Sequence, residues 1–167
     1  SESTRAIARR LNDFSLDAGI LYFKDGDPET TEKLYEERYV FIAPNSLTIL
    51  KEKQITWEEV AQFPLCLLTQ NMRNRQLIDQ QFLELGISPK IVTEASDFTG
   101  VLAQVALGNA ATIAPVSVAE TFLDLKSTVH LDLTHPVMIH SVGLSIKDQS
   151  PVLPIIKALR QAVKAAL

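Results

Sequence analysis

The feature that most constrains the fold of this chain is the alternation of short apolar segments with segments of helical periodicity. Apolar runs of strand length occur at Leu16–Phe23, Leu65–Thr69 and Ala111–Pro115. Between them, apolar residues recur at the i, i+3, i+4 spacing of a buried helix face. Strands that alternate with helices predict an α/β fold that contains parallel strand pairs.

The predicted order of elements is α, β, β, α, β, α, β, α, β, α, β, β, α. The strands are expected at Leu16–Phe23, Glu37–Ala43, Leu65–Thr69, within Ile87–Glu94, and at Ala111–Pro115, Thr128–Leu133 and Ile139–Ile146, with a polar loop at Lys24–Lys33. The expected helix ends are capping boxes at Thr56 with Glu59 and at Ser117 with Glu120, caps at Asp97 and Gly86, and an N-cap and N1 pair at Ser150 and Pro151.

The predicted helices bury one face each. Their inward residues are Thr4, Ile7, Ala8 and Leu11; Leu77, Ile78, Phe82 and Leu85; Val101, Leu102, Val105 and Ala106; Val118, Phe122 and Leu125; and Val152, Ile155, Ile156, Leu159 and Val163. Leu83 lies off the apolar face of its helix.

Composition excludes several classes of protein. Apolar residues make up 46% of the 167 residues, which is enough to bury a core, so a disordered chain is excluded. The longest uncharged stretch, Ala95–Ala119 interrupted only by Asp97, contains two glycines and a proline and does not form a membrane span. The net charge of −4 argues against binding to nucleic acid by this chain itself. No secretory signal opens the sequence, and Cys66 is the single cysteine, so the predicted compartment is the cytoplasm.

The residues that could carry catalysis or hold a metal are expected to have structural or surface roles instead. Three histidines, His130, His135 and His140, are spaced by five, which puts neighbours on opposite faces of a strand, and surface positions are expected for them. Cys66 lies in an apolar run and is expected to fill space rather than act as a nucleophile. Asp13 and Asp17 are expected to cap and to hydrogen-bond. The sequence therefore predicts no enzyme, no metal and no cofactor.

Turns between strands and helices are better candidates for ligand binding. The Thr69-Gln70-Asn71 turn leads from a strand into a helix, so free backbone N–H groups and a helix dipole favour an anion there. Ser3 and Thr4 form an equivalent turn before the first predicted helix. Asp97-Phe98-Thr99 forms a third, where a simple cap is favoured because Asp97 is negative. Ligands of open α/β sheets bind beyond the carboxyl ends of strands.

Two further features of these turns leave alternatives open. Phe98 and Val116 are candidate apolar walls of the site, and core packing explains both equally well. Arg73 and Arg75 lie at a helix start, where the dipole disfavours cations. Pairing with an acidic ligand group is one reading, and a solvated face or a salt bridge to Asp79 is the favoured one.

In several segments, the sequence resembles the effector-binding domain of LysR-type transcriptional regulators. The segments are Glu2-Ser3-Thr4 with Ile7 and Leu11; Leu16-Asp17-Ala18-Gly19-Ile20; Tyr39–Ala43 with Pro44 and Val60–Pro64; Arg75, Ile78, Asp79, Phe82 and Gly86; and Val105, Gly108 and Pro115. The last motif departs from the family pattern at Asn109 and Ala110, where the family has an apolar residue and a second glycine.

This resemblance implies a two-lobed fold like that of type II periplasmic binding proteins, with two crossover strands. Subdomain one would comprise residues 1–45 and 142–167 and would be incomplete, without its first strand, helix and strand. Subdomain two would comprise residues 46–141. A DNA-reading helix-turn-helix would lie upstream, outside this chain.

The function expected from the resemblance is the sensing of a small polar, anionic metabolite between the lobes, in a homo-oligomeric regulator. The ligand-binding residues would be Ser3, Thr4, Thr69, Gln70, Asn71, Phe98 and Val116. The helix Arg73–Gly86 would pair across a dimer. The alternative is a solute-binding α/β module that delivers its ligand to a transporter or an enzyme.

Overall fold

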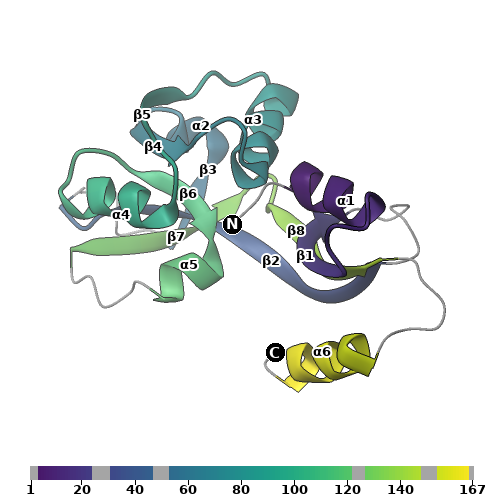
Figure 1. Ribbon diagram of the computed structural model, residues 1–167. Helices are drawn as coiled ribbons and strands as arrows, with labels where there is room; N and C mark the ends of the chain where they lie inside the picture. The colour runs from purple at the N-terminus through teal and green to yellow at the C-terminus, as the bar shows by residue number, and fades with distance from the viewer. Residues whose placement is uncertain (1–3, 24–30, 47–52, 122–126, 148–153, 166–167) are drawn as a thin grey trace. The chain divides into compact units, whose positions relative to one another are not determined.

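The computed structural model describes residues 4–23, 31–46, 53–121, 127–147 and 154–165 (Figure 1). The elements are α1 (Thr4–Asn12), β1 (Ala18–Phe23), β2 (Thr31–Pro44), β3 (Gln54–Thr56), α2 (Trp57–Val60), β4 (Pro64–Leu68), α3 (Arg73–Leu85), β5 (Lys90–Ala95), α4 (Phe98–Ala106), β6 (Thr112–Pro115), α5 (Val116–Thr121), β7 (Thr128–Thr134), β8 (Ile139–Ile146) and α6 (Pro154–Ala165). This order confirms the predicted succession and adds one strand, β3.

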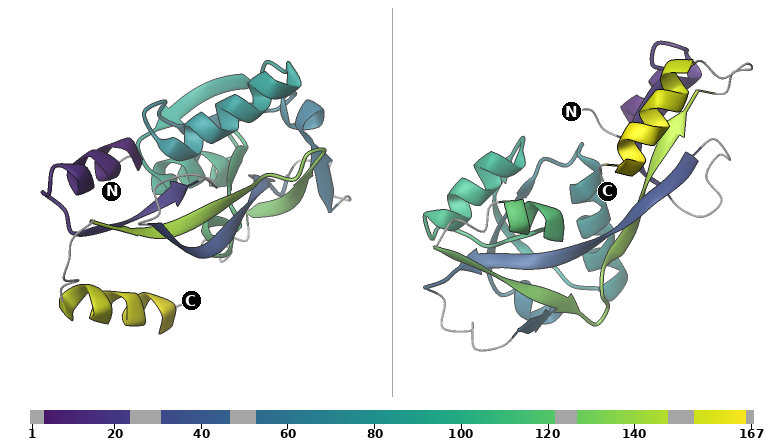
Figure 2. Two further views of the ribbon diagram at one scale, coloured as in Figure 1. Left: turned by 90° about the vertical axis from the view of Figure 1, so that its right-hand side faces the viewer. Right: turned by 90° about the horizontal axis from the view of Figure 1, so that it is seen from below.

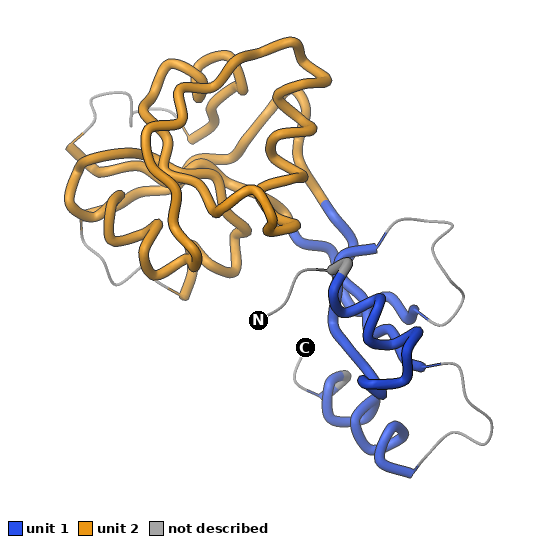
Figure 3. The backbone as a smooth tube through the Cα atoms, turned by 45° about the horizontal axis from the view of Figure 1, so that its top comes forward, with its two compact units in different colours: residues 1–37, 140–167 blue, residues 38–139 orange. Residues whose placement is uncertain are grey.

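The chain divides into two compact units, residues 1–37 with 140–167 and residues 38–139 (Figure 3). The divisions fall on β2 and β8, the two strands that run from one unit into the other. The subdomain boundaries predicted from the sequence follow residues 45 and 141. The two units of the structure divide after residues 37 and 139, which is earlier in both strands.

Unit 1 is a small sheet with a helix on each face. β1 pairs antiparallel with β8, from Ala18 opposite Ile146 to Phe23 opposite Ser141, and β8 borders β2. α1 and α6 lie on opposite sides of these strands (Figures 1 and 2). Because side chains alternate along a strand, Gly19 faces Ile7 of α1, whereas Ala18 packs on the α6 side.

Unit 2 is a larger sheet in which antiparallel and parallel pairs meet. β2 pairs antiparallel with both β6 and β7, and β3 adds to β7 in parallel. β4 and β5 form a parallel pair, which a parallel bridge between Leu65 and Ala111 joins to the start of β6. The Cys66 N–H donates to the Ala111 carbonyl at 2.9 Å, and the Ala111 N–H donates to Pro64 at 2.8 Å.

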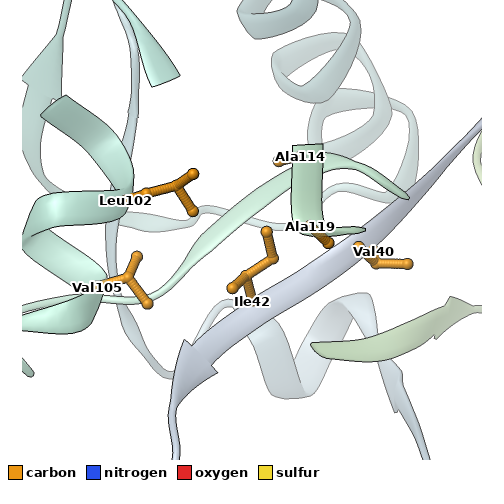
Figure 4. Packing of buried hydrophobic residues seen from close by; sticks show 6 residues of the cluster. All are labelled: Val40, Ile42, Leu102, Val105, Ala114 and Ala119. Atoms are coloured by element: carbon orange, nitrogen blue, oxygen red, sulfur yellow. The ribbon is translucent and has the colours of Figure 1, made fainter. Parts of the chain in front are cut away.

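Helices cover both faces of the unit 2 sheet. On one face, the buried residues of β2 and β6 pack against α4 and α5; Figure 4 shows this cluster, which comprises Val40, Ile42, Leu102, Val105, Ala114 and Ala119. On the other face, the Phe41 ring lies 5.3 Å from the Phe63 ring. Trp57 of α2 meets Phe82 of α3 edge-on at 5.0 Å, so the two helices share one aromatic contact.

Several local predictions are confirmed. Thr56 accepts a hydrogen bond from the Glu59 N–H at 3.3 Å, and the Glu59 carboxylate accepts one from the Thr56 N–H at 2.8 Å, which completes the predicted capping box. Gly86 ends α3 with a left-handed φ of 68°. Leu83 is 79% exposed, off the buried face of α3.

Other local predictions are wrong. β2 begins at Thr31, inside the predicted loop, because its first half pairs in unit 1. Ser117 is no cap: α5 begins at Val116, directly after β6, so Ser117 lies within the helix. Ala8 and Ile155, predicted to be buried, are exposed, since α1 and α6 each touch the sheet along a narrower stripe than the periodicity suggests. Predictions at Phe122, Leu125, Ser150, Pro151 and Val152 lie outside the described residues.

Candidate functional site

The predicted binding residues of unit 2 follow the carboxyl ends of adjacent strands. Leu68 pairs with Ala95 where β4 and β5 end. β6 runs parallel to β4 from the Leu65–Ala111 bridge and ends at Pro115. The segments that contain Gln70, Phe98 and Val116 therefore leave the sheet at one edge, which is where ligands of parallel sheets bind.

The turn from β4 into α3 is held by its own hydrogen bonds. The Thr69 N–H donates to the Ala95 carbonyl at 3.1 Å, and the Met72 N–H donates to the Thr69 carbonyl at 3.0 Å. The Thr69 hydroxyl donates to Asn71 Oδ1 at 2.8 Å, so these two side chains restrain each other. Gln70 and Asn71 are exposed, and Thr69 is half-buried.

Among the described residues, no side chain caps the beginning of α3. The N-cap residue is Met72, which makes no side-chain cap hydrogen bond, and the nearby hydroxyl of Thr69 is engaged with Asn71. The alternative that Thr69 merely caps this helix is therefore wrong. The first turn of any helix leaves its N–H groups without acceptors inside the helix, and the positive end of the helix dipole lies at the same place.

Arg75, in the first turn of α3, is held by three acceptors. Its Nε donates to Asp79 at 2.7 Å, and one Nη donates to Glu94 at 2.5 Å and to the Leu68 carbonyl at 2.9 Å. The side chain is 4% exposed, and the two carboxylates raise the pKa of Arg75 against the effect of burial. The predicted salt bridge to Asp79 is confirmed, and Arg75 is a structural link between α3, β4 and β5.

Arg73 and Asn74 precede Arg75 and differ from it. In the part of the chain that the structure describes, Arg73 Nε is buried without a hydrogen-bond partner. Asn74 is 6% exposed; its Nδ2 donates to the Tyr39 hydroxyl at 3.1 Å, while its Oδ1 has no partner. The sequence drew attention to Arg73 through its place at a helix start, but it gave no sign that Asn74, in a polar run, is buried.

The apolar candidates of the site also belong to the core. Phe98 packs against both the α4–α5 cluster and the cluster of Cys66, Leu68, Val101 and Ala110, and Val116 packs against the first of these. Asp97 caps α4 by accepting a hydrogen bond from the Gly100 N–H at 2.8 Å, which confirms the simpler reading of that turn.

The unit 1 candidates are described only in part. Ser3 lies outside the described residues, and Thr4 is the first residue of α1, with its side chain outside the description. Their role in binding stays a prediction.

The other reactive side chains have structural surroundings. Cys66 is fully buried, and burial raises the pKa of its thiol, so it fills space in the core as expected. Asp13 accepts a hydrogen bond from the Ser15 N–H at 3.0 Å. Hydrogen bonding with the Ser15 side chain, and then with this N–H, lowers the pKa of the Asp13 carboxyl. His130 and His135 are exposed, and the His140 ring meets Tyr22 edge-on at 6.4 Å. Across the described ranges, no group of His, Cys, Asp or Glu side chains is arranged to hold a metal ion.

Comparison with solved structures shows that other proteins share this fold. The regulatory domain of CcmR from Synechocystis PCC6803 in complex with 2-PG has a TM-score of 0.85 at 10% identity, over 98% of this chain and 79% of that one. The effector binding domain of QuiR in complex with shikimate has a TM-score of 0.79 at 20% identity, over 98% and 78%. The cofactor-binding domain of the Cbl transcriptional regulator has a TM-score of 0.80 at 20% identity, over 99% and 73%.

The family comparison covers the whole chain. The model of the LysR substrate binding domain matches residues 1–167. A search of curated proteins finds no match. None of the helices in the described ranges has the length and apolar character needed to cross a membrane. The chain thus belongs to the LysR substrate binding domain family, and it is the ligand-sensing part of a LysR-type transcriptional regulator.

Proposed function

We propose that this domain senses a small anionic metabolite bound at the edge of unit 2 where β4, β5 and β6 end. The observation that carries the proposal is the start of α3, which no side chain of the described ranges caps and which follows directly on the Thr69–Asn71 turn. The proposed ligand-binding residues are Ser3, Thr4, Thr69, Gln70, Asn71, Phe98 and Val116.

The ligand would act by binding one arrangement of the domain better than another. A ligand shifts an equilibrium only by its difference in affinity for the two states. Through linkage, that difference would reach a DNA-binding domain elsewhere in the full-length regulator. No chemical step on the ligand is needed, so we propose no enzymatic turnover, and the family favours this role over the alternative of a solute-delivering module. We further propose a cytoplasmic location, since the regulator acts on DNA.

We also propose that the full-length protein is a homo-oligomer in which α3 contributes to the contact between copies. Leu83, 79% exposed on the outer face of α3, supports this placement. Sedimentation of the full-length protein, with Leu83→Glu as the variant, is expected to show weaker association for the variant. Identical association of the two proteins contradicts the role of α3.

Calorimetry on the full-length protein tests the site. Shikimate and 2-PG, which are bound in two of the similar structures, serve as the first probes. Thr69→Val removes the hydroxyl that orders Asn71, and we expect it to weaken binding about tenfold while the free energy of unfolding changes by less than about 1 kcal/mol.

Thr93→Val is the matched control. Thr93 is an exposed residue of β5, so the same substitution there removes a hydroxyl away from the turn. It should leave the affinity unchanged. Equal affinities for the wild type, Thr69→Val and Asn71→Ala would show that the turn does not bind the ligand.

A further inference from the structure

Within the described ranges, β1 is the last strand of the unit 1 sheet, so one of its edges is open. The Lys147 N–H donates to the Asp17 carbonyl at 3.0 Å, and the next residue of β1, Ala18, lies opposite Ile146. Bonded and non-bonded pairs alternate along an antiparallel ladder, so Ala18 and Ile20 belong to non-bonded pairs. Their N–H and C=O groups therefore point away from β8, toward the open edge.

The sequence of β1 has none of the features that protect an exposed strand edge. The strand reads AGILYF, without a charged residue or a proline, and its register with β8 runs without a bulge. Strand edges that stay in water are usually protected by lysine, by proline or by a bulge. β1 therefore has the composition of an interior strand, which is paired on both sides.

Ile20 is an exposed apolar residue beside the same edge. Gly19 faces α1 and Ala18 packs on the α6 side, so the alternation of side chains puts Ile20 on the α6 side of the sheet. The residue is 51% exposed in the middle of an apolar strand. Covering it would remove apolar surface from water, which favours a further element on this face of the sheet.

α6 has a second apolar stripe besides the one that packs on the sheet. Ile156, on the packed stripe, is buried in a cluster with Leu144 and Ile146. The second stripe is exposed and follows the i, i+3, i+7, i+10 spacing of a seam between two helices: Ile155, Ala158, Ala162 and Ala165. We call these four residues the α6 seam. Because three of them are alanines, a neighbouring helix could approach closely.

The solved domains of this fold are longer than the part that this chain matches. The chain covers 78% of the QuiR effector binding domain and 79% of the CcmR regulatory domain, while 98% of its own length is matched in both. The remainder of each domain is longer than a strand and a helix of ordinary length together. A strand alone, such as β1 of a second copy, would cover the open edge and leave the α6 seam exposed. One segment that brings both a strand and a helix accounts for both surfaces.

We propose that unit 1 binds a segment of the full-length regulator that lies outside residues 1–167. Its strand pairs with the open edge of β1, and its helix covers Ile20 and the α6 seam. Backbone hydrogen bonds to Ala18 and Ile20 hold the strand, as in the addition of a strand to other sheet edges, and apolar contacts hold the helix. β1 and α6 contain none of the proposed ligand-binding residues, so this inference goes beyond the proposed function.

Hydrogen exchange of the full-length protein, resolved to single amides, tests the proposal. The Leu21 amide belongs to a bonded pair with β8, whereas the Ile20 amide faces the open edge and needs another strand for protection. We expect the two amides to exchange at rates within about tenfold of each other. Faster exchange of the Ile20 amide than this would show that the edge is open, and it would overturn the proposal.

Ile20→Lys tests the covering helix. It places a charge on the covered surface, so we expect the Ala18 amide to exchange at least about tenfold faster than in the wild type. Ile139→Lys is the matched control, because Ile139 is an isoleucine of β8 with 48% exposure, and it should leave the Ala18 amide unchanged. Amides of β4 report that both variants are folded. An unchanged Ala18 amide in Ile20→Lys, or equal acceleration in both variants, would overturn the proposal.

Dilution separates the proposed segment from a second copy of the protein. A segment of the same polypeptide protects the Ile20 amide equally at every protein concentration. Protection that falls on dilution, together with dissociation in sedimentation, would assign the open edge to a second copy and overturn the proposal. Effector titrations do not enter these measurements, so the proposed ligand site stands or falls separately.

Discussion

At the scale of single residues, the Thr112 hydroxyl on β6 is a buried polar group that lacks a hydrogen-bond partner within the described ranges. The residue is 1% exposed and pairs with Ile42 in the sheet. Valine has nearly the same shape without the hydroxyl, so Thr112→Val removes an unpaired polar atom from the core. We expect the free energy of unfolding in urea to rise by about 1 kcal/mol.

Thr134→Val is the control for this prediction. The Thr134 hydroxyl donates to the Ile55 carbonyl at 3.2 Å, so the same substitution there breaks a hydrogen bond. It should lower the free energy of unfolding by about 1 kcal/mol. A loss of stability in Thr112→Val as large as that in Thr134→Val would show that Thr112 has a partner.

Single residues of the candidate site were only partly predictable from the sequence. Thr69 and Asn71 follow a strand and precede a helical pattern, so their position at the turn could be predicted from the sequence. The bond between their side chains was not, because a hydroxyl at such a turn can equally cap the helix. Whether Arg73 or Arg75 has a counterion depends on Glu94, which the fold brings to α3 from β5 and which no local pattern reveals.

At the scale of elements, Arg75 links the start of α3 to β4 and β5. Arg75→Met removes donors to Asp79, Glu94 and the Leu68 carbonyl, and it leaves that carbonyl unpaired under the helix. We expect the free energy of unfolding to fall by about 2 kcal/mol, because the Leu68 carbonyl loses a charged donor while Asp79 and Glu94, at 40% and 38% exposure, stay in contact with water. Chemical denaturation measures the change.

The comparison variant is Arg38→Met. Arg38 lies 3.1 Å from Asp132, and both side chains are partly exposed, at 48% and 36%. An exposed pair contributes little, so we expect a loss below about 1 kcal/mol. Equal losses for the two variants would mean that Arg75 behaves as a surface residue.

Most elements were predictable because their periodicity is carried by buried residues. β3 was not, since three residues are too few for a pattern, and Gln54–Thr56 becomes a strand only by pairing with β7. The start of α5 was misplaced for a similar reason. Ser117 and Glu120 have capping-box spacing, but β6 leads into the helix without a gap, so the helix begins one residue earlier.

At the scale of the whole molecule, the two units differ in how much apolar surface they bury. Among the described residues, the buried apolar side chains of unit 1 are Leu11, Val142, Leu144, Ile146 and Ile156, whereas unit 2 holds the rest of the core. Regions with few buried contacts open at lower free energy. We expect amides of β1 and β8 to exchange at an opening free energy at least about 1 kcal/mol below that of amides in β4.

Native-state hydrogen exchange measures these opening free energies. The second half of β2, from Arg38 to Pro44, belongs to unit 2 and serves as an internal reference. Its amides should have the same opening free energy as the amides of β4. Equal opening free energies throughout β1, β8 and β4 would show that the chain opens as a single cooperative unit.

The pairing of β1 with β8 also governs the order in which the protein can fold as a ribosome makes it. Every residue of β1 pairs with a residue of Ser141–Ile146, the last strand that the structure describes. Unit 2 is one continuous segment, so all of it leaves the ribosome before β8, the strand that pairs with β1, has been completed. During that interval the nascent chain carries a finished unit 2 beside an unpaired strand with Ile20 and Leu21 uncovered, and this is the species on which a chaperone would act.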